Sequence, residues 1–216
     1  VQSIPLGGGL FLLNGSEDTE NETLDAFELG YRHLIAENFS YDLALFYHSY
    51  SDVIGYSGVP ASFADNIGEG QTYGLEVSAN FDVNADWRFM ATYSYTGMYL
   101  DFGDSIGTIA NPSRPFVNYD EDSTARHKAS LRSFYKITDG INFDVSIYYM
   151  GEYDSSSLIG IPIDSYMKVD ARFAWRPTNS TEISINAYNL SSPSTLQGGG
   201  FAEVPRRFLF LLTHNF

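Results

Sequence analysis

Cysteine is absent from this sequence of 216 residues, which excludes disulfide bonds and thiolate metal sites. Basic residues are few: 12 Lys and Arg stand against 27 Asp and Glu. The resulting net charge of −15 argues against a nucleic-acid partner, because phosphate binding needs a basic surface. Long apolar runs are absent too. The longest, such as 208–212, fall far short of the ~18–20 residues that a membrane-spanning helix requires.

Aromatic residues are abundant instead, with 16 Tyr and 16 Phe against only 2 Trp. They follow a two-residue period. In segment 39–50, Leu43 and Tyr47 fall on one face of an extended chain, whereas Asp42 and His48 fall on the other. Successive side chains of a strand point to opposite faces, so this pattern predicts a strand with one apolar side. Tyr and Phe also suit strands and membrane interfaces.

The same alternation recurs along the chain and predicts about nine strands, each near the ~9–11 residues that cross a bilayer at a tilt. No segment shows convincing helical periodicity. Besides 39–50, the predicted strands are 72–82, 86–100, 141–150, 166–176 and 205–216, with weaker alternation at about 24–34, 126–136 and 182–190.

The connections between these segments alternate in length. Short polar turns are predicted near Ala36–Asn38, Asn84–Asp86, Thr138–Gly140 and Pro177–Ser180. Long connections rich in Gly, Ser, Pro and Asp are predicted at 53–70, 102–124, 153–164 and 191–204, and residues 1–23 also read as an external-type loop. Transmembrane β-barrels show this alternation, with short periplasmic turns and long external loops.

The polar face of the strands decides between a membrane barrel and a soluble one. Its charged members include Glu76, Arg88, Asp144, Lys168, Asp170 and Arg172. A small soluble barrel fills its interior with apolar side chains, whereas these charges need a wide interior that is wet or plugged. Aromatic residues at the ends of the apolar face, such as Trp87 and Tyr99, resemble the girdles at membrane interfaces. A soluble sandwich of two sheets also alternates and is the competing interpretation.

The predicted fold is therefore all-β: a transmembrane antiparallel up-and-down β-barrel. Single-chain bacterial barrels have an even number of strands, whereas the count here is odd and follows a long external-type loop. A barrel that is open at one edge leaves backbone groups unsatisfied in lipid. We therefore expect this chain to form only part of a barrel, with further N-terminal strands outside it.

Several short motifs follow one another along the predicted strands. They are Tyr73-Gly74-Leu75-Glu76, Val169-Asp170-Ala171-Arg172 followed by Trp175-Arg176-Pro177, and Asn189-Leu190 before a loop. In this order they resemble the late barrel strands of TonB-dependent receptors, and the resemblance covers about residues 24–216. No single motif is specific, but the ordered set is.

The last strand resembles the C-terminal signal that the barrel-assembly machinery reads in outer-membrane barrels. The residues of that signal are Phe208, Phe210, Leu212 and the terminal Phe216. An ordinary amphipathic last strand would show the same alternation. The chain's ending on an aromatic residue favours the signal.

The resemblance implies a barrel of about 22 strands, with an N-terminal plug domain in its lumen and a short box that couples the plug to TonB. Residues 24–216 are then the C-terminal part of the barrel domain, and the plug domain lies outside this chain. The implied function is active uptake of a scarce nutrient across the bacterial outer membrane, with ferric siderophore as the leading ligand class. A passive porin-like channel is the alternative, which an upstream plug domain would argue against.

The resemblance also implies the partners of the chain. These are outer-membrane lipid and lipopolysaccharide, the barrel-assembly machinery, the TonB complex through the plug, and a small-molecule ligand. Acidic residues gather in the external-type loops, as in Glu17–Glu22 and Asp120–Asp122. They would capture a cationic ligand or divalent ions, although a solvated anionic surface is the simpler interpretation. Pro112–Phe116 lies in the longest loop and is a candidate for ligand contact, but no ligand-contact residue is assigned.

No catalytic, cofactor-binding or metal site is predicted. Gly68-Glu69-Gly70 with Gly74 mimics a dinucleotide-binding pattern but lacks the following helix, and Gly74 more simply relieves crowding beside an aromatic neighbour. The four histidines, of which His48 and His127 are candidates to line the lumen, show no metal-ligand spacing. Without a nucleophile elbow, an outer-membrane hydrolase is a third hypothesis, which a Ser/His pair or catalytic carboxylates near the external rim would support.

Overall fold

The computed structural model describes residues 4–6, 11–57, 61–102, 121–154, 162–192, 194–196 and 203–215. Every regular element within these ranges is a β-strand, and no helix in them is long and apolar enough to cross a membrane. Nine strands are between 8 and 24 residues long. They are β3 (Thr23–Ala36), β4 (Phe39–Ser57), β5 (Ala61–Asn84), β6 (Trp87–Asp101), β7 (His127–Thr138), β8 (Ile141–Met150), β11 (Tyr166–Thr178), β12 (Thr181–Tyr188) and β15 (Arg207–His214).

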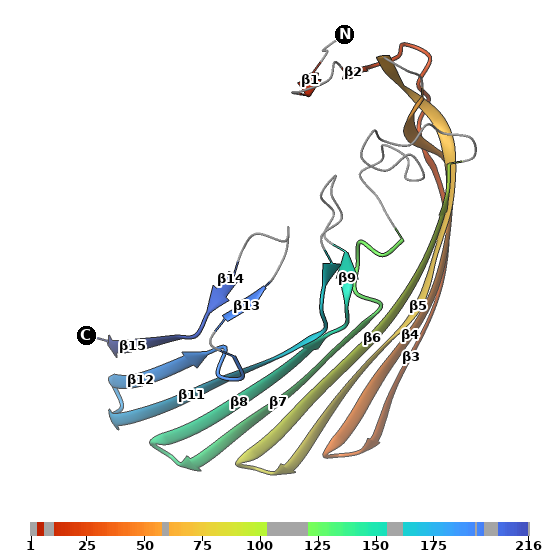
Figure 1. Cartoon of the computed structure of the whole chain (residues 1–216). Helices are drawn as coiled ribbons and strands as arrows, with labels where there is room; N and C mark the ends of the chain where they lie inside the picture. Colours follow the sequence, from red (N-terminus) through yellow and green to blue (C-terminus); the bar gives the residue numbers. More distant parts are fainter. Residues whose placement is uncertain are drawn as a thin grey trace.

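The nine long strands form one curved sheet in which each pairs antiparallel with the next along the chain (Figure 1). This up-and-down order confirms the predicted fold class, and each of the nine strands overlaps one of the nine predicted segments. Two-residue connections join β5 to β6 and β7 to β8 where short turns are predicted. The soluble sandwich is wrong for the described residues, because their long strands lie in one sheet rather than in two facing ones.

Six shorter strands lie in segments that are predicted from the sequence to be loops. β9 (Tyr153–Asp154) pairs with β10 (Pro162–Ile163), and β13 (Ser194–Leu196) pairs with β14 (Glu203–Pro205). In the first part of the chain, β1 (Ile4–Leu6) pairs with β2 (Phe11–Asn14), which in turn runs parallel to the start of β5. Segments 1–23, 153–164 and 191–204 therefore each contain strand pairs as well as loop.

The long loop predicted at 53–70 is wrong, because β4 and β5 continue through most of it as an extended hairpin. The glycines that indicated a loop serve close packing instead. A Cβ on Gly68 would lie 2.4 Å from the ring of Phe102, and one on Gly55 would lie 2.9 Å from Ile67. Phe102 and Val53 are buried in this small cluster, so a side chain at either glycine would displace its neighbours.

Strand register sorts the side chains of the sheet into an apolar and a polar face. On the apolar face, Leu29 pairs with Leu45, and Leu45 pairs with Leu75. Large apolar side chains on this face are open to the surroundings, with Leu29 68% and Phe210 72% exposed. A contiguous apolar surface of this kind is unusual for a soluble monomer and matches a wall that contacts lipid.

The arc of nine long strands has two open edges in the described residues. β3 pairs only with β4, and β15 pairs only with β12, so the described sheet is an arc rather than a closed barrel (Figure 1). Unpaired N–H and C=O groups on such edges are costly in lipid. A barrel that contains this arc needs further strands to pair with β3 and β15.

Candidate functional site

The concave face of the arc, here called the inner wall, is the candidate functional surface. Apart from the ends of strands beyond a bulge, alternation places the even-numbered side chains of β3 to β8, β11 and β12 on this wall, and register aligns them into rows across neighbouring strands. One row joins Asp42, Ser78, Thr92, Ser130 and Tyr148. The sequence predicts strand and face for four of these residues and only the strand for Ser130, and register shows which of them are neighbours.

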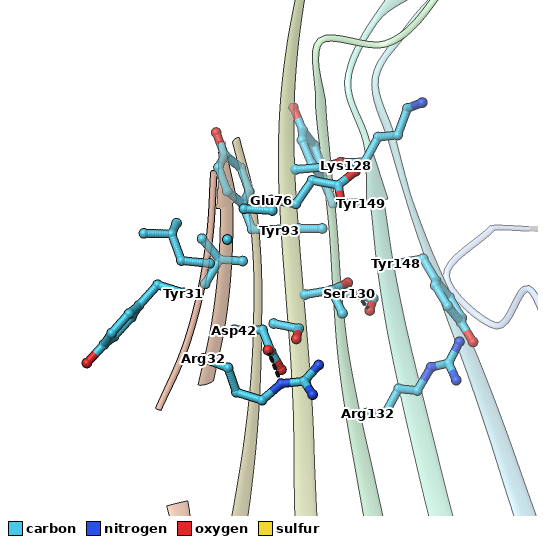
Figure 2. A pocket seen from close by; sticks show the side chains of 18 of the residues that line it. Tyr31, Arg32, Asp42, Glu76, Tyr93, Lys128, Ser130, Arg132, Tyr148 and Tyr149 are labelled. Atoms are coloured by element: carbon cyan, nitrogen blue, oxygen red, sulfur yellow. Dashed lines mark hydrogen bonds and ion pairs between the residues drawn. The ribbon is translucent and has the colours of Figure 1, made fainter. Parts of the chain in front are cut away.

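A hollow of about 920 Å³ lies on the inner wall between β3 and β8 (Figure 2). Its polar lining includes hydroxyl groups from three strands, and Thr92 Oγ1 and Ser130 Oγ are hydrogen-bonded at 2.7 Å. Arg32 and Asp42 form an ion pair at one side. The charged side chains that line the hollow are Arg32, Asp42, Glu76, Lys128 and Arg132.

The aromatic ring of Tyr148 lies close to two basic side chains beside this hollow. Arg132 Cζ lies 5.5 Å from the centre of the Tyr148 ring, and Lys168 Nζ lies 4.6 Å from it. Lys168 also pairs with Asp170 at 3.2 Å. The negative face of an aromatic ring attracts cations, so Tyr148 holds both basic groups at defined positions.

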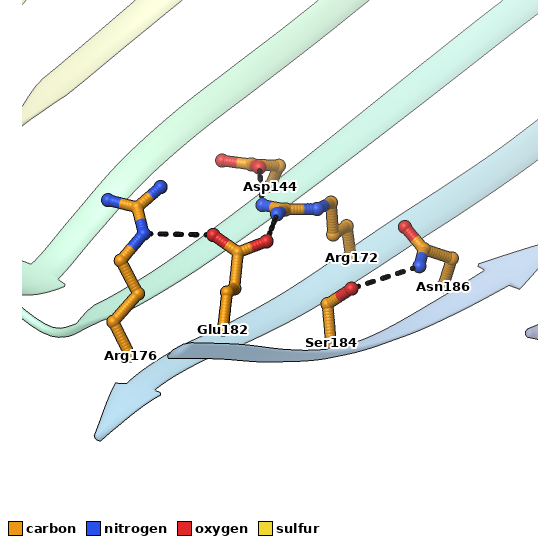
Figure 3. Close-up of polar contacts among 6 residues, drawn as sticks. All are labelled: Asp144, Arg172, Arg176, Glu182, Ser184 and Asn186. Atoms are coloured by element: carbon orange, nitrogen blue, oxygen red, sulfur yellow. Dashed lines mark hydrogen bonds and ion pairs between the residues drawn. The ribbon is translucent and has the colours of Figure 1, made fainter. Parts of the chain in front are cut away.

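A charged network crosses three strands further along the inner wall (Figure 3). Glu182 accepts hydrogen bonds from Arg172 Nη2 at 2.6 Å and from Arg176 Nε at 2.8 Å. Arg172 Nη1 also donates to Asp144 at 3.3 Å. Charge-assisted bonds of this geometry are stronger than neutral ones, so the network ties β8, β11 and β12 together on the lumen side.

Substituting Glu182→Gln should lower the free energy of unfolding by about 1–3 kcal/mol, because Arg176 loses its charged partner and a hydrogen bond to a charged group is lost. The Glu182 side chain is only 23% exposed, so water replaces the bond incompletely. Urea unfolding of the intact protein in lipid vesicles measures the change. Glu28→Gln is the matched control, since Glu28 is 72% exposed and 3.4 Å from His48. Equal effects of the two substitutions would argue against the network's role.

The last long connection is fixed by one amide side chain. Asn189 is fully buried and has a φ of 56°. Its Nδ2 donates to the Val204 carbonyl at 2.8 Å, and its Oδ1 accepts from Thr195 Oγ1 at 3.0 Å. The Asn189 backbone N–H donates to Asp170 on the wall at 2.9 Å. Both arms of the β13–β14 hairpin are thereby tied to β11, which explains the Asn-Leu motif in physical terms.

Asn189→Ala should loosen the β13–β14 hairpin, because two hydrogen bonds are lost and alanine is disfavoured at positive φ. Each lost hydrogen bond costs about 1 kcal/mol, so cleavage within 191–204 by a non-specific protease should accelerate at least about tenfold. Asn80→Ala is the control, since Asn80 lies on the wall without a side-chain hydrogen bond in the described residues. Unchanged cleavage of Asn189→Ala would refute the tether.

Two histidine positions differ in outcome. His48 lies on the inner wall as predicted for a lumen residue, 3.4 Å from both Glu28 and Thr72. His127 does not face the lumen, because it pairs with Tyr95 on the apolar face and its Nδ1 is 2.8 Å from the Tyr93 hydroxyl. Whether the odd-numbered or the even-numbered residues of a strand face the lumen has to be read from the alternation of apolar and polar residues. In segment 126–136 this alternation is too weak to decide it.

The three neighbouring side chains Glu28, His48 and Thr72 have the composition of an acid, a base and a nucleophile. Their two 3.4 Å contacts are longer than effective proton-transfer bonds. Both β4 and β5, which carry His48 and Thr72, pair on both sides over this stretch, so in the described residues their backbone N–H groups are committed to the sheet and are not available to an oxyanion. This geometry does not support the hydrolase hypothesis. The described residues also hold no group of three or more His, Asp or Glu that would bind a metal ion.

The turn between β7 and β8, outside the spanning strands, contains a carboxyl group with a shifted pKa. The pKa of Asp139 is lowered because Lys136 Nζ donates a hydrogen bond to it at 2.6 Å and adds a favourable charge interaction. Asp139 stays ionised under ordinary conditions. The turn therefore carries an exposed ion pair between Lys136 and Asp139.

The remaining predicted site residues have mixed outcomes. Phe208, Phe210 and Leu212 lie on the apolar face of β15, paired with Ala187, Ile185 and Ile183 of β12. Phe216 and the loop segment Pro112–Phe116 lie outside the described residues. The assembly signal therefore stays a prediction. Glu17 and Asp18 are exposed, in keeping with a solvated acidic surface.

The family comparison matches residues 4–190 to the model described as TonB dependent receptor-like, beta-barrel. Solved structures share the fold at low identity. The ferric-catecholate import receptor Fiu from E. coli K12 is 18% identical over 93% of this chain and 29% of its own, with a TM-score of 0.69. The ferripyoverdine receptor of the Pseudomonas aeruginosa outer membrane is 15% identical over 90% and 27%, with a TM-score of 0.68.

The FrpB iron transporter from Neisseria meningitidis is 13% identical over 96% of this chain and 33% of its own, with a TM-score of 0.71. No curated protein matches the chain. Identities this low establish the arrangement of strands and nothing about the ligand. The chain spans about a third or less of the length of each of these three structures.

Proposed function

Because this chain belongs to the family of TonB-dependent receptor-like β-barrels, we propose that it forms part of the wall of an outer-membrane receptor for active nutrient uptake. The leading ligand class is a ferric siderophore. The proposal is supported by the polarity of the arc: its apolar face suits lipid, and its charged inner wall suits a wide aqueous or plugged lumen.

The proposed receptor acts by binding and gating rather than by catalysis. Its location is the bacterial outer membrane, where lipid and lipopolysaccharide contact the apolar face. Energy comes from the TonB complex through a plug domain outside this chain, and the assembly machinery reads the Phe208–Phe216 segment. Three of the related structures are named as receptors or a transporter for iron or ferric ligands, which favours iron as the cargo.

Transport measurements test the proposal. Cells that lack the intact receptor should lose uptake of radioiron supplied as one member of a panel of catecholate, hydroxamate and carboxylate siderophores. Restoring the gene should restore uptake, and collapsing the proton-motive force should abolish it again. Uptake that persists without the proton-motive force would identify a passive channel instead. Unchanged uptake of every member of the panel in the deletion strain would refute the siderophore assignment.

A further inference from the structure

The basic side chains of the inner wall differ in whether they have a carboxylate partner. Most of its basic side chains in the described residues have a carboxylate partner: Arg32, Arg88, Lys136, Lys168, Arg172 and Arg176. Three basic side chains of the wall have no carboxylate partner among the described residues: Lys128 and Arg132 of β7, and Arg207 of β15, which stacks on Tyr188. Lys128 Nζ donates a hydrogen bond to Thr124 Oγ1 at 3.3 Å, and Arg132 Cζ lies 5.5 Å from the centre of the Tyr148 ring. Lys128 and Arg132 line the same hollow (Figure 2), whereas Arg207 does not.

The two unpaired cations of the hollow, Lys128 and Arg132, lie on one line down the wall. Lys128, Ser130 and Arg132 are alternate residues of β7, so their side chains share the inner face and the two cations are about 13 Å apart along the strand. Ser130 and Thr92 place a hydroxyl pair between them. The line runs from the end of β7 that follows a long connection toward the middle of the sheet.

The chemistry of this line is that of an anion receptor. An arginine fork binds planar oxygen groups in two places at once, and hydroxyls and an ammonium group add further donors. Tyr148 already fixes Arg132 in position, which reduces the entropy lost when an anion binds. The hollow is lined by three basic and two acidic side chains, whereas the chain as a whole has a net charge of −15, so the local charge balance runs against the composition.

From this contrast we infer that Lys128, Ser130 and Arg132, with Tyr148, form an anion-binding track on the inner wall for the solute that crosses the barrel. The ligand class is a small polyanion that presents carboxylate or catecholate oxygens, such as an anionic metal chelate. The inference rests on the proposed uptake role and names the charge of its solute. Exposed acidic loops do not cancel the track, because salt screens such charges beyond a Debye length of about 8 Å.

Equilibrium dialysis of the intact receptor in detergent tests the track with two probes of similar size that differ in charge. One is the tris-catecholate iron(III) complex, which carries three negative charges, and the other is the neutral tris-hydroxamate iron(III) complex. The wild type should hold the anionic complex at least about tenfold more tightly than the neutral one. Lys128→Gln with Arg132→Gln should abolish this preference, and added salt should weaken it in the wild type.

The matched control is Arg207→Gln. Arg207 also stacks on a tyrosine, Tyr188, on the inner wall, but it lies on β15 away from the hollow. The control should keep the preference for the anionic complex. If the Arg207 variant and the double variant lose the preference equally, the positive charge acts through a diffuse electrostatic field and the inference is wrong. A wild type with no preference for the anionic complex would also overturn it.

A third outcome assigns the cations to a different partner. If the double variant keeps its charge preference but melts at a lower temperature than the control, Lys128 and Arg132 hold an acidic part of the receptor itself, and the inference is wrong. Dialysis requires no energised membrane. The binding preference for the anionic complex can therefore be measured even in a receptor that does not transport siderophores. Failure of this test is thus distinguishable from failure of the proposed function.

Discussion

Replacing Leu45 with arginine should destabilise the folded receptor in lipid by about 2–4 kcal/mol, if Leu45 lies near the middle of the bilayer. Leu45 is central in β4, paired with Leu29 on one side and Leu75 on the other, and all three belong to the apolar face. Arginine there would carry a charge into hydrocarbon. Folding equilibria of the intact receptor in lipid vesicles, followed by the mobility shift of the folded barrel, measure the difference.

Ser78→Arg is the control for this substitution. Ser78 lies on the neighbouring strand β5 but on the inner wall, where it lines the hollow, so a charge there meets water or polar groups. The control should cost far less than Leu45→Arg. Equal costs would mean that the two faces do not differ in polarity of surroundings, and the assignment of the apolar face to lipid would fail.

Replacing Gly74 with alanine should prevent assembly of the β4–β6 region or destabilise it by about 3 kcal/mol or more. A Cβ at this position would lie 2.1 Å from the backbone oxygen of Tyr95 and 2.6 Å from the ring of Phe46. The ring can turn away, but the oxygen belongs to the adjacent strand β6 and cannot move without breaking the sheet. The yield of heat-modifiable folded receptor in the outer membrane reports the effect.

Gly30→Ala provides a control of opposite sign. The nearest atom to a Cβ on Gly30 is the Leu43 backbone oxygen at 4.0 Å, so the methyl group fits. Glycine in a strand is less stable than alanine by about 0.5–1 kcal/mol, and this substitution should therefore be neutral or stabilising. Similar losses at both positions would show that crowding at Gly74 is not the reason for its glycine.

The period-two alternation was enough to predict strands and faces where it is strong. Segment 72–82 lies in the second half of β5, and its odd-numbered residues lie on the apolar face. In β7 the alternation is broken by Ser133, which lies on the apolar face and accepts a hydrogen bond from Trp87 Nε1 at 2.9 Å. Because that partner is remote in sequence, the face of His127 could not be read correctly.

The inner-wall hollow could not be predicted, because it joins residues from strands whose relative register is absent from local sequence. Arg132 and Tyr148 belong to different strands, and their contact depends on how β7 and β8 align. The extended β4–β5 hairpin was missed for another reason. Its glycines have the composition of a loop, and only the remote ring of Phe102 shows that they are packing positions.

The continuous rows of the sheet constrain how the length of such a chain can change during evolution. Inserting one residue into β8 would exchange its faces beyond that point and turn charged Asp144 toward lipid and Phe143 toward the lumen. Inserting two would keep both faces and only lengthen the strand. Length differences between descendants of this gene should therefore fall in connections such as 102–124, and within spanning strands they should come in even numbers.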